Sequence, residues 1–460
     1  MMFFTNKKII LSLFLSLSFL FPLVAELSTI EVPDSSVIRQ NLISSWFTAP
    51  VSSLKAKSEE LYTAQDGTVF QVRFEDGEKE VKIIVCPQIY VLPEENSVNS
   101  RQNLPVEQYN KNSFGSWILY REKSSGRPLK IKWHFAKDPN VYVQLRQDSE
   151  KTYADLIVYN SFAARSVPLG VSFARLYSVS FQHLYSLTRK TIAWDSVLPV
   201  LGQYEALIKT ENLIREKLPF IVYTKNACYN EKGELYSIQT GKPLTPPFDP
   251  LATDKTLYLS GAGFVKWIVD GIVKHYTGEG VKIAELVEPT ISFDELGKNG
   301  IISQNWDMTF TLDWVRNLAA CALSVRSSHD YNYETGGVDV TRNLFSSTLQ
   351  SDGKIIRSKG YVKNSGYTMQ DIRGLLYMLA VTEPNYFYLA AIREPSVSKD
   401  DEIVFNNSLV IFPSFDDSGI FHCSIFEMGV EMSLDKFIER YSNCYVHLER
   451  VRAPEVFLPK

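Results

Sequence analysis

The sequence predicts an α+β protein in which an all-β domain precedes a second domain that runs helices first and strands afterwards. Two patterns carry this prediction. Stretches of alternating hydrophobic and polar residues follow one another from about residue 63 to residue 177, as expected for strands with one buried face. Beyond residue 190, stretches with helical spacing come before a last group of strand-like stretches, and this order is typical of α+β folds.

Length and charge limit the classes of function. The chain has 460 residues, of which 45% are hydrophobic, so it can form two or more domains with ordinary cores. Its formal net charge is −4 and it contains no block of Lys and Arg. These features argue against a nucleic-acid-binding protein.

Residues 1–25 have the composition of a signal peptide. Lys7 and Lys8 precede an apolar run over 9–24, and Ala25 is a candidate cleavage point. The alternative is an uncleaved membrane anchor, although the run is slightly short for a span. We therefore expect an extracytoplasmic protein, periplasmic or secreted, with no membrane span in the mature chain.

The first domain is expected over residues 26–190 as a sandwich or a small barrel. Residues 68–74 and 80–86 alternate on either side of a turn, which predicts a hairpin. Further strands are expected at 116–121, 129–135, 141–145 and 153–159. His134 lies in one of these strands without a partner motif, and we interpret it as a packing residue.

The second domain is expected over residues 191–460. Its predicted helices cover 194–218, 263–275, 310–325 and 368–381, and the last of these begins with a capping box at Thr368 and Asp371. Its predicted strands cover 386–392, 409–412, 421–426 and 445–450.

The helix near residue 261 is the most distinctive stretch of this domain. Hydrophobic residues cover most of its circumference, while Lys266, Asp270 and Lys274 form one polar stripe. Ser260 is a candidate N-cap, and the small residues at 261–263 allow other groups to approach the helix start. A helix N-terminus favours anions and thiolates, so this is a suitable place for a nucleophile, but the stretch contains no Cys.

The sequence gives no indication of a metal or a cofactor. The five cysteines are widely spaced and form no C-x-x-C pair, and neither a P-loop, a dinucleotide fingerprint nor a His-Glu-x-x-His motif occurs. Cys423 and Cys444 can form a disulfide if their strands pair, and buried free thiols are the alternative.

Two segments resemble motifs of the NlpC/P60 cell-wall peptidases. Residues 263–268, Gly-Phe-Val-Lys-Trp-Ile, resemble the helix start of that family, whose pattern is Asp-Cys-Ser-Gly-hydrophobic-Val. Residues 409–412 and 422–429 resemble its hairpin, Asp-Leu-Val-Phe-Phe followed by His-Val-Gly-Ile-Tyr-hydrophobic-Gly. The resemblance covers residues 220–450 at most. It implies a papain-like domain with an insertion that includes the helix at 310–325.

The resemblance also implies where the site residues lie. In papain-like hydrolases a His accepts the proton of a Cys thiol, and a third polar group orients the imidazole. Gly261 stands at the position of the Cys, and His422 stands at that of the base, where it would be vestigial. Ser260 is an alternative nucleophile, and His447 on a later strand is a candidate orienting residue. Since glycine has no nucleophilic side chain, the implied site is degenerate.

Three functions remain open at this point. The first is an exported, inactive NlpC/P60-like module that binds peptidoglycan peptide or another envelope ligand. The second is an active cell-wall hydrolase, a peptidoglycan endopeptidase or amidase, that uses a displaced nucleophile. The third is a structural or partner-binding envelope protein.

Overall fold

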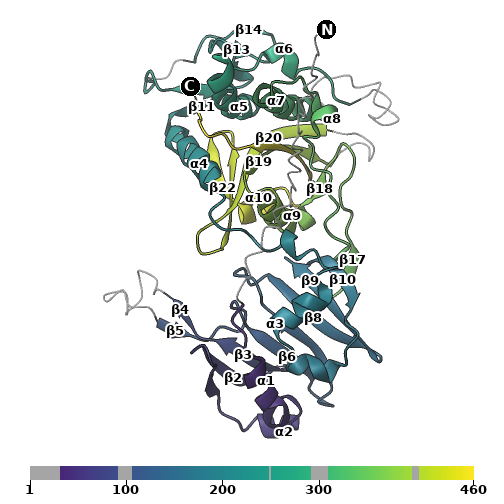
Figure 1. Cartoon of the computed structure of the whole chain (residues 1–460). Helices are drawn as coiled ribbons and strands as arrows, with labels where there is room; N and C mark the ends of the chain where they lie inside the picture. Colours follow the sequence, from purple (N-terminus) through teal and green to yellow (C-terminus); the bar gives the residue numbers. More distant parts are fainter. Residues whose placement is uncertain (1–31, 92–105, 248–249, 292–308, 396–403, 460) are drawn as a thin grey trace, which may run out of the picture. The chain divides into compact units, whose positions relative to one another are not determined.

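The structure is a computed structural model, and it describes residues 32–91, 106–247, 250–291, 309–395 and 404–459. The predicted signal peptide and Ala25 lie outside these residues. The chain from Val32 onward forms one compact unit, and its two large sheets contain the predicted strands (Figure 1). The mixed α+β class predicted from the sequence is confirmed, whereas a papain-like arrangement remains a proposal.

The first sheet is formed by ten strands in the order β1-β2-β3-β6-β7-β8-β9-β10-β16-β17. All of its neighbouring strands run antiparallel. The predicted hairpin is present as β2 and β3, with Phe70 opposite Pro87 and Asp76 opposite Val81. The strands are β1 (Glu60–Thr63), β2 (Val69–Asp76), β3 (Glu80–Pro87), β6 (Trp117–Glu122), β7 (Pro128–Trp133), β8 (Val141–Asp148), β9 (Lys151–Val158), β10 (Ser161–Pro168), β16 (Ser347–Leu349) and β17 (Ile355–Arg357).

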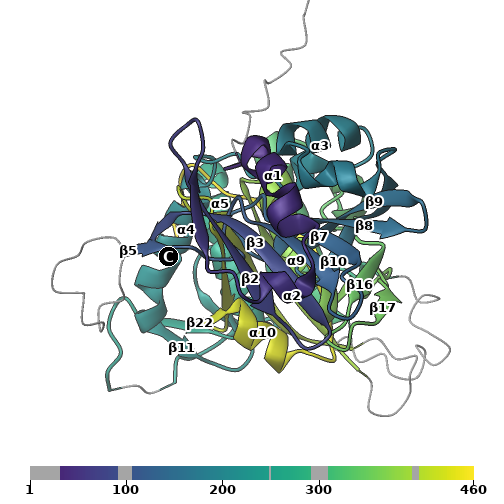
Figure 2. The same cartoon turned by 90° about the horizontal axis from the view of Figure 1, so that it is seen from below.

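Helical segments, not a second sheet, pack on one face of this sheet (Figure 2). Trp133 of the sheet lies 5.3 Å from the ring of Phe181, and the Arg39 guanidinium stacks 4.7 Å above the same indole. The expected sandwich or barrel is therefore replaced by a helical layer on one open sheet. The covering segments are α1 (Ser36–Leu42), a π-helical turn (Ile43–Phe47), α2 (Val51–Leu54), a 3₁₀ turn (Phe173–Tyr177), α3 (Phe181–Thr188) and a 3₁₀ turn (Trp194–Ser196).

The second sheet has the order β18-β23-β19-β20-β21-β22. Helices α5 and α7 lie side by side and pack on β20 and β19 (Figure 1). The elements are α5 (Gly261–Thr277), α6 (Ile283–Leu286), α7 (Phe310–Ser327), α8 (Tyr333–Gly336), β18 (Tyr367–Thr368), α9 (Met369–Thr382), β19 (Tyr386–Glu394), β20 (Val404–Phe415), β21 (Phe421–Glu427), β22 (Val430–Ser433), α10 (Leu434–Arg440) and β23 (Tyr445–Arg452).

Small sheets and one helix connect the two parts. They are α4 (Glu205–Lys217), a 3₁₀ turn (Leu218–Phe220), the parallel pair β11 (Ile221–Tyr223) and β15 (Leu257–Leu259), and the sheet of β12 (Ala227–Tyr229), β13 (Leu235–Ser237) and β14 (Lys242–Pro243). A separate hairpin of β4 (Ile89–Val91) and β5 (Val106–Gln108) lies between β3 and β6 in the chain.

The helix expected over 194–218 begins only at Glu205. Pro199 precedes this point, and Gly202 adopts a positive φ of 79°. Proline disfavours a helical conformation in the residue before it, and a left-handed glycine cannot continue a right-handed helix. In this loop Val197 is buried, whereas Val200 and Leu201 are exposed, so the apolar spacing at 197–201 does not mark a buried helical face.

The expected capping box at the start of α9 does not form. Thr368 is the N-cap residue, but its side chain accepts no capping hydrogen bond. Asp371 is buried and instead accepts hydrogen bonds from Thr348 at 2.9 Å and Ser358 at 2.6 Å. Because Thr348 lies on β16, this carboxylate links α9 to the edge of the first sheet. Strands from within the range of the second domain thus complete the sheet of the first.

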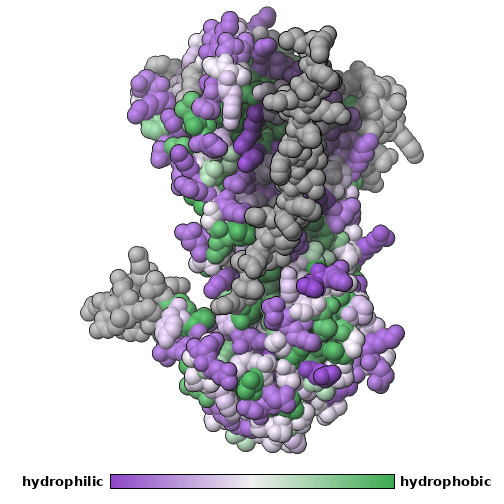
Figure 3. Space-filling view, viewed as in Figure 1, coloured by the Kyte–Doolittle hydropathy of each residue, from purple (hydrophilic) through white to green (hydrophobic). Residues whose placement is uncertain are grey.

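The outer surface is mixed in character. On the face shown in Figure 3, hydrophobic residues occur in small patches between hydrophilic ones. Among the described residues, no helix is both long and apolar enough to cross a membrane. The five cysteines are all free thiols, so Cys423 and Cys444 are not joined.

Candidate functional site

The start of α5 is fixed by a close approach of the β12 backbone. The Ser260 side chain is the N-cap: it accepts a hydrogen bond from the Gly263 N–H at 3.1 Å and donates one to the Ala227 carbonyl at 2.9 Å. A Cβ atom on Gly263 would lie 2.1 Å from that carbonyl oxygen. Glycine at 263 is therefore required by packing, and the N-cap predicted for Ser260 is confirmed.

Gly261 opens onto a pocket of about 380 Å³, which we call the α5 pocket. Its lining is mostly polar and comes from the start of α5, the loop before β12, the start of α7 and the start of β20. The lining residues are Tyr223, Lys225, Asn226, Ile238, Gln239, Ser260, Gly261, Ala262, Phe310, Thr311, Phe405, Asn406, Asn407, Ser408 and Met428.

Two main-chain donors face this pocket. The first N–H groups of a helix have no partner within the helix. Ser260 satisfies the N–H of Gly263, and its carbonyl accepts from that of Phe264. Within the described residues, no group accepts a hydrogen bond from the N–H of Gly261 or Ala262. Together with the helix dipole, these donors favour an oxygen that carries negative charge.

Amide side chains form much of the remaining wall. Asn226 donates a hydrogen bond to Gln239 at 2.7 Å, Asn406 donates to Glu394 at 2.8 Å, and Asn407 donates to the Tyr441 hydroxyl at 3.1 Å. Each amide also has a carbonyl oxygen and a second N–H with which to contact a ligand. The wall is therefore both a donor and an acceptor of hydrogen bonds.

The structure does not bring His422 to this pocket. Gly261 lies beside Ser408 and Met428, whereas His422 pairs with Ser414 on the β20–β21 hairpin. Six residues separate the two places along each strand, which corresponds to roughly 20 Å at the rise of a β-strand. Proton transfer needs hydrogen-bond contact, so the expected pairing of His422 with position 261 is wrong.

His422 is instead an exposed partner of Asp416. Its Nε2 lies 3.0 Å from the Asp416 carboxylate, and its side chain is 57% exposed. Burial acts to raise the pKa of Asp416, but hydrogen bonds from Ser418 and His422 outweigh it and hold that pKa well below its usual value. This pair lies at the turn between β20 and β21 and stabilises that turn.

The alternative nucleophiles, Ser260 and Cys228, are also unsuitable, because the first is hydrogen-bonded and the second is buried. The Ser260 hydroxyl is 8% exposed and already makes two hydrogen bonds. Cys228 lies on β12 and is fully buried, and burial raises the pKa of its thiol to about 12, although Lys266 acts in the opposite direction. A thiol with this pKa carries almost no thiolate at neutral pH.

His447 lies in a second polar region, on β23. Two strands, β19 and β20, stand between β23 and β21, so His447 is about 14 Å or more from the strand of His422. The expectation that His447 orients His422 is therefore wrong. Its Nδ1 lies 2.6 Å from Glu449, which is two residues further along the same face of β23.

This region forms a buried network around Arg316 of α7. The Arg316 guanidinium donates to Asp339 at 2.7 and 3.2 Å, to Thr290 at 3.1 Å and to Asn364 at 3.0 Å. His447 Nε2 lies 3.1 Å from the Tyr361 hydroxyl and 3.4 Å from Arg316. We call these residues the Arg316 network: Thr290, Arg316, Asp339, Tyr361, Asn364, His447 and Glu449.

Burial and neighbouring charges shift the pKa values of the ionisable groups in the Arg316 network. Burial lowers the pKa of His447 to about 3 and raises that of Glu449 well above its usual value. Burial alone would lower the pKa of Arg316, but Asp339 raises it. Arg316 and Asp339 therefore form an ion pair between α7 and the segment at 338–340, which pairs with β23.

Three residues of this network have the donor atoms of a metal site. Oxygen and nitrogen atoms of Asp339, His447 and Glu449 lie within 4.8 Å of one another. However, the Arg316 guanidinium lies 2.7 Å from Asp339 and 3.4 Å from His447. A cation at that place would be repelled by the guanidinium, so the arrangement fits an internal ion pair better than a metal centre.

The sequence predicts the start of α5 but not the pocket residues that surround it. Asn406 and Asn407 lie just before the strand predicted at 409–412, and no motif marks them as site residues. His447 and Glu449 have the i, i+2 spacing that places two side chains on one face of a strand, and this spacing was the available indication of their contact. No sequence pattern indicates their meeting with Arg316, which lies 131 residues away.

Comparison with known proteins gives a match only for the first part of the chain. Residues 28–196 match the family model described as a domain of unknown function (DUF8515). No curated protein and no solved structure gives a significant match. The matched residues include most of the first sheet and end before the α5 pocket and the Arg316 network.

Proposed function

We propose that the chain is a non-catalytic binding module of the cell envelope that takes a peptide in the α5 pocket. The single observation that carries this proposal is the pair of main-chain donors at Gly261 and Ala262, which have no partner among the described residues and open into a pocket walled by amide side chains. A helix start of this kind binds a carbonyl or carboxylate oxygen, and the amides complement a peptide backbone.

A peptide with a free carboxylate fits this chemistry best. The helix dipole favours a negative oxygen, and Lys225 on the pocket wall adds a positive charge. The stem peptides of peptidoglycan carry both carboxylates and amide carbonyls, and they are the ligand that the NlpC/P60 resemblance suggests. The expected extracytoplasmic location, which rests on the composition of residues 1–25, is consistent with that ligand.

The geometry favours binding over hydrolysis. Acyl transfer by this kind of site needs a nucleophile and a base in contact. The described residues that line the α5 pocket include neither Cys nor His. The Ser260 hydroxyl is used as the N-cap, and the buried hydroxyls of Ser408 and Thr311 line the pocket without a His among its lining residues. The proposed role of Gly261 is to leave space at the helix start for a ligand oxygen.

Titration of the protein with a synthetic stem tetrapeptide tests this proposal. Isothermal titration calorimetry of the wild type is expected to give saturable binding, and Gly261→Val is expected to weaken it at least tenfold. The valine would place its side chain over the two N–H groups, where the nearest neighbour is the flexible side chain of Met428 at 3.3 Å from the Cβ position. The loss follows from displacement of a charge-assisted hydrogen bond, worth about 1.5–3 kcal/mol.

A pair of lysine variants provides the matched control. Lys225→Gln removes a positive charge from the pocket wall and is expected to weaken binding several-fold. Lys190→Gln removes the same charge from an exposed position outside the pocket and is expected to leave binding unchanged. If the wild type does not bind the peptide, or if Gly261→Val binds it as well as the wild type does, the proposal is wrong, and a structural role becomes the better account.

A further inference from the structure

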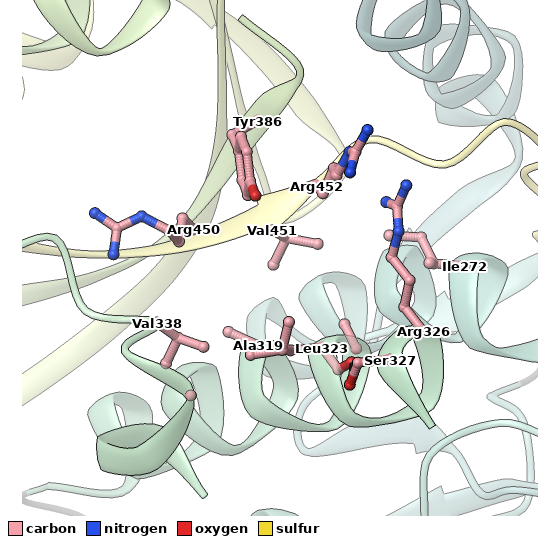
Figure 4. A pocket seen from close by; sticks show the side chains of 12 residues that line it. Ile272, Ala319, Leu323, Arg326, Ser327, Val338, Tyr386, Arg450, Val451 and Arg452 are labelled. Atoms are coloured by element: carbon pink, nitrogen blue, oxygen red, sulfur yellow. Dashed lines mark hydrogen bonds between the residues drawn. The ribbon is translucent and has the colours of Figure 1, made fainter. Parts of the chain in front are cut away.

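A second pocket lies between the last turns of α7 and the end of β23 (Figure 4). Its volume is about 350 Å³, which is within the range of small-molecule sites. It shares no lining residue with the α5 pocket. We call it the Arg452 pocket, and its wall is made by Ile272, Ala319, Ala322, Leu323, Arg326, Ser327, Gly336, Val338, Tyr386, Arg450, Val451 and Arg452.

The floor of the Arg452 pocket is apolar. Figure 4 shows Val338, Ala319 and Val451 directed toward the same space. All three are buried. The ring of Tyr386 stands at the opposite wall. This floor favours the hydrocarbon part of a ligand, because apolar surface that leaves water on binding contributes favourably.

Three arginines surround this floor, and they differ in their partners. Arg450 donates to the Glu383 carboxylate at 3.2 and 3.3 Å and to the carbonyls of Gly337 and Asp339. Arg326 makes one long contact of 3.4 Å with the Ala453 carbonyl. No described carboxylate forms an ion pair with Arg326 or Arg452, whereas that of Glu383 pairs with Arg450.

The two arginines without a carboxylate stand together. In Figure 4 the Arg326 and Arg452 side chains rise on one side of the pocket, while Arg450 points to the other. Two like charges at one rim repel each other unless an anion lies between them. A planar guanidinium is suited to hold a carboxylate through two parallel hydrogen bonds.

We propose that the Arg452 pocket is a binding site for a carboxylate carried on an apolar body, such as a medium-chain fatty acid. The carboxylate lies between Arg326 and Arg452, and the hydrocarbon part lies on the floor formed by Ala319, Val338 and Val451. Both parts of the ligand are required, because the charge lies only at the rim and the floor offers no polar side chain. This site is independent of the peptide proposed for the α5 pocket.

Three probes separate the two requirements. Octanoate has the carboxylate and the apolar body, 1-octanol has only the body, and acetate has only the carboxylate. Titration of the full chain, monitored by isothermal titration calorimetry, is expected to show binding of octanoate at least tenfold tighter than that of either other probe. Equal affinity for octanoate and octanol would overturn the role of the arginines.

Charge variants then locate the binding site. Arg452→Gln is expected to weaken octanoate binding about tenfold, as expected for loss of a hydrogen bond to a charged group. Arg452 is exposed, so this variant is expected to fold normally, and Arg452→Lys is expected to retain part of the affinity. Arg357→Gln, at an exposed position on β17, is the matched control and is expected to bind like the wild type.

Arg326→Gln gives a second, independent reading of the same site. It is expected to weaken octanoate binding to a similar extent, with an unchanged far-ultraviolet circular dichroism spectrum as the check on folding. The proposal is overturned if octanoate does not bind to the wild type. It is also overturned if both arginine variants bind octanoate as tightly as the Arg357→Gln control.

Discussion

The α5 pocket and the Arg316 network both gather polar groups beside the second sheet, but they satisfy these groups in opposite ways. In the network, Arg316 pairs with Asp339 and His447 contacts one oxygen of Glu449, while the other oxygen of Glu449 has no partner among the described residues. In the pocket, the donors of Gly261 and Ala262 have no partner among the described residues. Buried polar groups are normally paired. We therefore interpret the Arg316 network as structural, and we propose the start of α5 as the ligand site.

The largest expected effect comes from breaking the network. Arg316→Met would leave the Asp339 carboxylate without its main partner, and Arg316 is only 1% exposed. Removing one member of a buried ion pair typically costs about 3–5 kcal/mol. We expect a loss of that size in the free energy of unfolding, measured in urea. Arg357→Met, at an exposed position, should change it by less than about 0.5 kcal/mol. A loss below about 1 kcal/mol for Arg316→Met would contradict the structural interpretation.

A second buried imidazole, that of His134, lies outside the Arg316 network and also affects stability. His134 is buried against Tyr142, and burial lowers its pKa from 6.5 to about 4. Below pH 6.5 the unfolded chain binds a proton that the folded chain does not bind until about pH 4, so stability falls as the pH falls through this window. The difference corresponds to about 3 kcal/mol at most. We expect His134→Gln to flatten the dependence of unfolding free energy on pH between 4 and 6.5. An unchanged slope would mean that His134 does not titrate in this way.

A smaller loss of stability is expected from a change at the N-cap of α5. Ser260→Ala removes the acceptor for the Gly263 N–H, and loss of such a cap costs about 1 kcal/mol. Ser260→Thr keeps a hydroxyl at the same position and is expected to lose less. Thermal unfolding of both variants measures this difference. If alanine and threonine give equal melting temperatures, the side chain of Ser260 is not a cap in solution.

The smallest expected effect is on catalysis. Gly261→Cys restores the residue type that the NlpC/P60 pattern has at this position, yet His422 lies roughly 20 Å away at the strand rise. A cysteine without a base in contact gains little nucleophilic power. We expect no hydrolysis of a stem tetrapeptide above that of the wild type, as measured by chromatography of the products. Clear turnover by this variant would show that a base reaches position 261 and would revive the hydrolase hypothesis.

The fold was largely predictable from local pattern, and the sites were predictable only in part. Alternation along 68–86 predicted the hairpin of β2 and β3, and the small residues before Phe264 predicted the start of α5, because both depend on neighbours in the sequence. The helix expected from residue 194 was wrong, since a run of apolar residues has the same appearance in a loop that packs on a core. The helical cover of the first sheet and the joining of β16 to it depend on contacts across long separations.

The dependence on contacts between distant residues also explains why the predicted pairing of Gly261 with His422 was wrong. The position of Gly261 at a helix start follows from local sequence, and it is correct. Its relation to His422 was inferred from the order of two motifs, and order does not determine which end of a hairpin faces a helix. The structure places Met428, at the other end of β21, beside Gly261. The distance between two separate motifs depends on how the sheet packs on the helices. The residue spacing within either motif gives no information about that packing.

The most direct test of the proposed ligand site is to observe the Gly261 N–H while the peptide binds. In protein labelled with ¹⁵N-glycine, the amide resonance of Gly261 is assigned from its absence in Gly261→Val. We predict that this resonance moves saturably as the stem tetrapeptide is added, with the same dissociation constant as calorimetry gives. Saturable binding with an unmoved Gly261 resonance would contradict the claim that the open donors at the start of α5 form the ligand site.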